Sequence, residues 1–84
     1  MPRYFFHVHD GEDFTDLQGT ELVDMEAARL EAVRFAAALL RDKADSFWND
    51  SEWRLRVTNK SDLTLFELTF FGTIAPAGRN EAPT

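Results

Sequence analysis

The chain has 84 residues, no Cys, 44% hydrophobic residues and a formal net charge of −6, with 15 acidic residues against nine basic ones. This length fits one small domain, and the missing Cys excludes disulfides, a thiol nucleophile and Cys-based zinc sites while suiting a reducing compartment. No run reaches the roughly 18 apolar residues of a membrane span and no signal-peptide pattern is visible, so we expect a cytoplasmic protein with no membrane partner.

The first predicted element is a strand over residues 3–9. Tyr4, Phe6 and Val8 alternate with Arg3, Phe5, His7 and His9, and this period of two with aromatic content is typical of a strand. Residues 10–13 predict a turn around Gly11. Residues 14–22 are the candidate for a short second strand, and the acids between Asp10 and Asp16 are expected in a solvated loop.

A helix is predicted from Met25 to about Lys43, with Asp24 as its N-cap and Glu26 favourably placed in its first turn. The residues at helical spacing on its apolar face are mostly alanine: Met25, Ala28, Ala32, Phe35, Ala36 and Leu39. Small side chains let the helix lie close to a sheet, so the large core residues must come from the strands.

After a connection over residues 43–52, two further strands are predicted, and together they would form a hairpin. Trp53, Leu55 and Val57 are expected to point inward from the first of these strands, and Phe66, Leu68 and Phe70 from the second. The turn between them is residues 59–62. We expect a single domain over residues 1–72 and a disordered tail over residues 73–84.

These elements predict an α+β fold, in the order strand–(strand)–helix–strand–strand. A small antiparallel sheet of three or four strands would carry one helix packed on one face. The opposite face would then be open to solvent, a ligand or another subunit.

Five segments follow one another over roughly residues 1–71: the start MPRYFFHVHDG, the pattern D-x-x-G-T-E-L, the helix segment EAARLEA and the hairpin segments WRLRVTN and LFELTF. In this order and spacing they resemble a family of short uncharacterised alphaproteobacterial proteins, frequent in rhizobia and their relatives. The resemblance implies a bacterial cytoplasmic origin and the layout above. It assigns no activity and no catalytic residue.

The open sheet face is the main candidate for a function. Its expected residues are Phe5, His7, His9, Arg54, Arg56, Leu65, Glu67 and Phe71. Phe5, Leu65 and Phe71 would form an apolar patch, and such patches on small domains usually bury against protein. We therefore expect a non-enzymatic interaction module, a homodimer or a binder of another protein, that uses this face or the sheet edge.

Single-stranded nucleic-acid binding is the alternative, because aromatics beside Arg on an open sheet can stack bases. Phe5, Arg54, Arg56 and Phe71 would carry it. The chain has no Lys or Arg between residues 10 and 26, where acids are frequent, so it should repel a phosphate backbone there. Nucleic acid is therefore the less favoured partner.

A metal-dependent role is the third possibility. His7 and His9 lie two residues apart and would point the same way from a strand, with Asp10, Glu12 or Asp13 as a further ligand. The chain offers only two His, however, and a zinc site needs three or four protein ligands. No nucleophile motif and no phosphate-binding loop is visible, so we expect neither a cofactor nor an enzyme.

Overall fold

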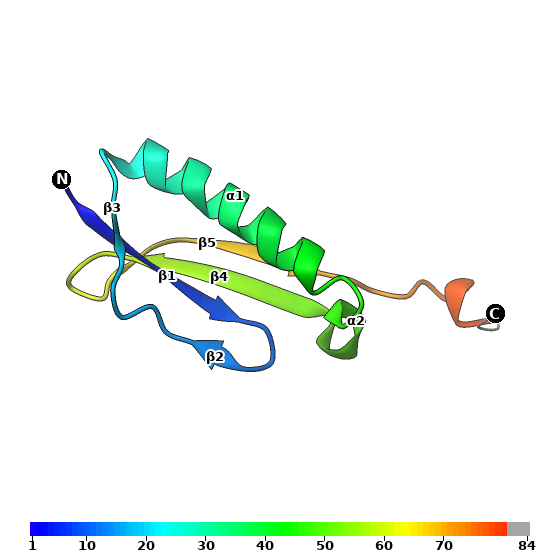
Figure 1. The fold of residues 1–84 in the computed structure, drawn as a ribbon. Helices are drawn as coiled ribbons and strands as arrows, with labels where there is room; N and C mark the ends of the chain where they lie inside the picture. The colour runs from blue at the N-terminus through cyan, green and yellow to red at the C-terminus, as the bar shows by residue number, and fades with distance from the viewer. Residues whose placement is uncertain (81–84) are drawn as a thin grey trace.

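The structure is a computed structural model that describes residues 1–80, and it consists of an antiparallel sheet with a helix packed across one face (Figure 1). The strands are β1 (Arg3–His9), β2 (Asp13–Phe14), β3 (Thr20–Glu21), β4 (Glu52–Thr58) and β5 (Thr64–Phe71). The helices are α1 (Met25–Asp42), the one-turn α2 (Phe47–Asp50) and a short 3-10 helix at Gly78–Asn80.

The predicted α+β class is confirmed, but the sheet has five strands among the described residues, where three or four were expected. The extra strand arises because residues 14–22 supply no single return strand. The two-residue β2 and β3 instead pair with opposite ends of β1. The connection over residues 43–52 also contains α2, so α1 is not the only helix.

The strand order is β2-β1-β4-β5, with β3 also pairing to β1. The register brings Val8, Leu55 and Leu68 side by side across β1, β4 and β5. Residues at such positions share one face of the sheet. The three long strands therefore present one continuous apolar face to the helix.

Helix α1 begins where the sequence predicts. The Asp24 carboxylate accepts a 2.9 Å hydrogen bond from the backbone N–H of Ala27, which satisfies one of the free donors of the first turn. Ala28, Ala32 and Ala36 are completely or almost completely buried against the sheet. The alanine face thus brings the helix backbone close to the large side chains of the strands.

The core lies under α1 and is supplied mainly by β1 and β4. The buried apolar side chains of the sheet are Tyr4, Phe6, Val8, Trp53, Leu55 and Val57. Strand β5 contributes only partly buried residues, Leu65, Phe66 and Leu68. A helix about 10 Å wide covers about two strands that are spaced 4.8 Å apart, so the helix-side face of β5 is incompletely covered.

No helix within residues 1–80 has the length and apolar character that crossing a bilayer requires. The predicted tail begins at residue 73, and its described part includes the 3-10 helix at Gly78–Asn80. Residues 81–84 of that tail lie outside the described residues.

Candidate functional site

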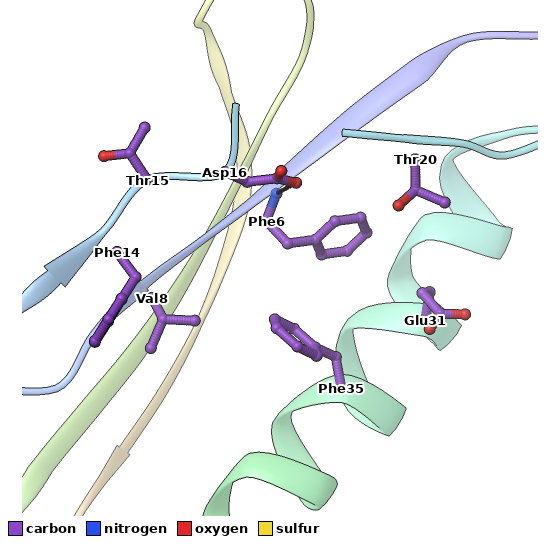
Figure 2. A pocket seen from close by; sticks show the side chains of 8 residues that line it. All are labelled: Phe6, Val8, Phe14, Thr15, Asp16, Thr20, Glu31 and Phe35. Carbon is purple, nitrogen blue, oxygen red and sulfur yellow. Dashed lines mark hydrogen bonds between the residues drawn. The ribbon is translucent and has the colours of Figure 1, made fainter. Parts of the chain in front are cut away.

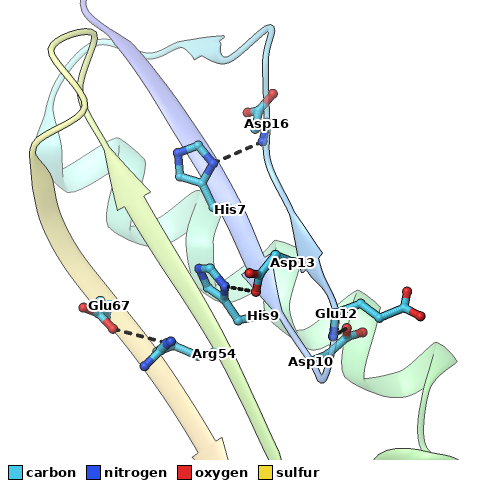
Figure 3. Close-up of polar contacts among 8 residues, drawn as sticks. All are labelled: His7, His9, Asp10, Glu12, Asp13, Asp16, Arg54 and Glu67. Carbon is cyan, nitrogen blue, oxygen red and sulfur yellow. Dashed lines mark hydrogen bonds and ion pairs between the residues drawn. The ribbon is translucent and has the colours of Figure 1, made fainter.

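His7 lies on the sheet face away from α1, as the alternation predicts, but it is not open to a partner. Its side chain is buried, with a relative exposure of 5%. Nδ1 accepts a 3.1 Å hydrogen bond from the backbone N–H of Asp16 (Figure 3). Nε2 lies 2.9 Å from the Thr58 hydroxyl. The prediction of an exposed His7 is therefore wrong, because the segment around Asp16 folds over it.

The Asp16 carboxylate holds that segment in place. It accepts hydrogen bonds from the backbone N–H groups of Phe6, Gln18 and Gly19 at 3.0–3.1 Å. Burial raises the pKa of Asp16, but these N–H groups, Gly19 first, outweigh it and hold the pKa below its usual value. Asp16 is thus part of the structure of the sheet edge, whereas the sequence predicted a member of a solvated loop.

His9 and Asp10, two of the other suggested metal ligands, have separate partners. His9 Nδ1 lies 2.6 Å from an Asp13 carboxylate oxygen, and Asp10 forms a 3.0 Å ion pair with Lys43 (Figure 3 shows both acids). The hydrogen bond to Asp10 raises the pKa of Lys43. Among residues 1–80, no three His, Asp or Glu side chains are arranged to hold a metal ion.

The two predicted arginines are occupied on the same face. Arg54 Nε lies 3.7 Å from the Glu67 carboxylate (Figure 3), and Arg56 donates a 3.2 Å hydrogen bond to the Thr64 hydroxyl. Both Arg54 and Glu67 are more than two-fifths exposed, so their ion pair is worth at most about 1 kcal/mol. The centre of this face is therefore polar, and both of its arginines already have partners within the chain.

The predicted apolar patch of Phe5, Leu65 and Phe71 does not form. Leu65 is the extra residue of a β-bulge, since Val57 pairs with Phe66 while Thr58 pairs with Thr64, and it packs against the core. Phe5 pairs with Thr58 and Phe71 with Glu52, at opposite ends of β4 and about 20 Å apart. Only Phe71, 69% exposed, offers a large apolar surface.

The free edge of β5 is the feature that sequence reasoning named only in passing. Strand β5 ends the sheet order, so one of its sides has no neighbouring strand within residues 1–80. The backbone N–H of Gly72 donates to the Ser51 carbonyl at 2.8 Å, so residue 72 faces β4. Because antiparallel pairs alternate, Glu67, Thr69 and Phe71 direct their backbone N–H and C=O groups to the free edge.

The opposite edge of the sheet is protected. Strands β2 and β3 pair with the two ends of β1, and the Asp16 carboxylate accepts from the Phe6 N–H between them. Natural sheets blunt their exposed edges with short strands, charged residues or Pro. From Phe66 to Phe71, β5 carries no Pro and Glu67 as its sole charge.

Aromatic side chains gather where the free edge ends. Phe70 and Phe71 are 39% and 69% exposed, and Trp48 of α2 is 54% exposed. They line a groove of about 500 Å³ together with Phe47, Leu40 and Ala44. Gly72 makes this arrangement possible, because a Cβ there would lie 2.6 Å from the Trp48 ring.

A second hollow runs along the other side of α1, between the helix and the strands β1 and β2. It consists of two adjoining parts of about 350 and 270 Å³ that share Val8, Phe14 and Phe35. Figure 2 shows Phe6 and Phe35 facing each other across the larger part, with Glu31 and Thr20 nearby. The smaller part continues past Leu39 to Lys43.

These features define a small α+β domain with one long helix on an antiparallel sheet that has one protected and one open edge. The chain belongs to the DUF6894 family, a domain of unknown function that matches residues 3–72. That segment runs from the first residue of β1 to the residue after β5. No curated protein and no solved structure matches the chain.

Proposed function

We propose that this protein is a non-enzymatic interaction module that self-associates by pairing β5 of one copy with β5 of a second copy. The observation that supports the proposal is the free edge of β5, with the backbone groups of Glu67, Thr69 and Phe71 directed outward. Addition of a strand to such an edge is a common mode of protein recognition, because the backbone supplies ready-made donors and acceptors.

Apolar surface would add to the backbone hydrogen bonds. The helix-side residues of β5 are Phe66, Leu68 and Phe70, and α1 leaves all three at least partly exposed. A strand added at this edge would place its own helix-side residues beside them. The helix-side residues of β5 that α1 leaves partly exposed would thereby gain apolar contacts in the pair.

A two-fold axis at Thr69 gives a favourable register. It places Glu67 opposite Phe71 of the second copy on one face, and Leu68 opposite Phe70 on the other. An axis at Glu67 would instead set two carboxylates directly opposite each other, which is destabilising. A symmetric pair of this kind is closed, so the expected product is a dimer.

Nucleic-acid binding has less support from the geometry. Arg54 is paired with Glu67, and the two aromatic residues that would stack bases, Phe5 and Phe71, lie about 20 Å apart along the sheet.

The resemblance of residues 1–71 to short bacterial proteins supports a bacterial cytoplasmic setting for the proposed dimer.

Sedimentation equilibrium over a range of micromolar concentrations tests the proposal with a matched pair of variants. Thr69→Pro removes an N–H that faces the free edge and leaves the hydrogen bonds to β4 in place, whereas Thr69→Val changes the side chain and keeps the N–H. We expect dimers for the native chain and Thr69→Val, and monomers for Thr69→Pro. A native chain that stays monomeric throughout would refute the proposal.

A further inference from the structure

The hollow between α1 and the strands β1 and β2 combines aromatic rings with an acid. Phe6, Phe14 and Phe35 contribute rings, and Phe6 meets Phe35 edge-to-face with centroids 6.2 Å apart. Glu31 lies on the lining on the same side as Thr20 (Figure 2). Aromatic faces and a carboxylate are the groups that recognise organic ammonium ions, since both attract positive charge.

The two ends of the hollow differ in whether their charges are already paired. At one end, Lys43 forms its 3.0 Å ion pair with Asp10. At the other, the half-buried Glu31 has no ion pair and no side-chain hydrogen bond with any of residues 1–80. Asp16, also on the lining, accepts three backbone N–H groups and keeps its negative charge nearby. The Glu31 end therefore carries negative charge that no ion pair within residues 1–80 neutralises.

The protein itself places an ammonium group against one of these rings. Lys43 Nζ lies over the ring of Phe14, 6.0 Å from its centroid. This distance is at the limit of a cation–π interaction. The contact comes from the Lys43 end, so the partly exposed Phe35 ring near Glu31 remains available.

We propose that this hollow binds an amphipathic primary amine, with its ammonium group at Glu31 and its apolar chain along Phe35 and Leu39. Glu31, Phe35 and Leu39 follow one another at intervals of four residues on one side of α1, so Glu31 and Leu39 are about 12 Å apart along the axis. The combined hollow lies within the usual size range of small-molecule sites. This site is distant from the β5 edge and does not depend on self-association.

Calorimetry at pH 7 and low salt with three probes of equal chain length tests the proposal: octylammonium, 1-octanol and octanoate. We expect octylammonium to bind about tenfold more tightly than octanol, since a charge-assisted hydrogen bond distinguishes them, and octanoate to bind most weakly. Equal affinity for octylammonium and octanol, tightest binding of octanoate, or no binding of any probe would overturn the proposal.

A pair of charge-removing variants locates the ammonium group. Glu31→Gln should weaken octylammonium binding about tenfold and leave octanol binding unchanged. The control Glu26→Gln removes the same charge from an exposed position on the same helix and should change neither by more than about twofold. Equal effects of the two variants would contradict a specific role for Glu31.

Discussion

The backbone N–H of Asp16 donates a 3.1 Å hydrogen bond to Nδ1 of His7, which fixes the protonation state of a buried imidazole. Because Nδ1 accepts, the ring proton of neutral His7 is on Nε2 and is donated to the Thr58 hydroxyl 2.9 Å away. Protonation of Nδ1 would turn an acceptor into a donor that faces another donor. The network therefore requires a neutral ring.

The first prediction concerns the dependence of stability on pH. Burial, followed by repulsion from Arg56, lowers the pKa of His7 in the folded protein below 6.5. The unfolded chain then binds more protons below about pH 6.5, so this contribution to the free energy of unfolding is complete above that pH and is lost as the pH falls further. The expected slope is at most about 1.4 kcal/mol per pH unit.

Urea unfolding followed by tryptophan fluorescence between pH 5 and 7.5, at constant protein concentration, measures this slope. His7→Gln should remove this dependence of the free energy of unfolding on pH, whereas His9→Gln should retain it because His7 is still present. The pH range stays above the acidic window in which protonation of Asp16 would add its own loss of stability. Identical slopes for the native chain and His7→Gln would contradict the prediction.

The second prediction concerns Asp16 itself. Asp16→Asn replaces a carboxylate that accepts three backbone N–H groups by an amide with one oxygen and a competing donor. We expect the free energy of unfolding to fall by about 2–3 kcal/mol. Asp45→Asn is the same change at an exposed position whose side chain has no hydrogen bond or ion pair with residues 1–80, and it should alter the free energy of unfolding by no more than about 0.5 kcal/mol. Similar effects of both variants would argue against the network.

The third prediction tests the close approach of α1 to the sheet. Ala32 is completely buried, so Ala32→Leu must push the helix away from the strands and should destabilise the protein by about 1–3 kcal/mol. Ala37→Leu introduces the same side chain on the exposed side of α1 and should change the free energy of unfolding by about 0.5 kcal/mol or less. Chemical denaturation distinguishes the two variants, and equal stability would contradict the packing described above.

Local patterns in the sequence correctly predict the features that depend only on residues close together along the chain. The Asp24 cap, the alanine face of α1 and the inward residues of β1 and β4 are all confirmed. Each depends on a spacing of a few residues, because caps and periodic patterns are local properties.

Long-range relations account for the errors. Alternation placed His7 on the face away from α1, but it contains no information on which loop folds over that face. Regular alternation predicts that Leu65 points outward, but a bulge adds one residue to β5 and shifts the alternation there. No residue type marks this bulge in the sequence. The free edge of β5 depends on strand order, which the sequence pattern does not specify.

Hydrogen exchange of individual backbone amides tests the proposed self-association most directly. In a dimer formed by β5, the N–H groups of Glu67, Thr69 and Phe71 become hydrogen-bonded between copies, and their protection should rise with protein concentration. The amides of Leu68 and Phe70, which face β4, serve as internal references because they are bonded within one chain. Protection of Glu67, Thr69 and Phe71 that increases with concentration is the predicted result. Rapid exchange of these three amides at every concentration would contradict it.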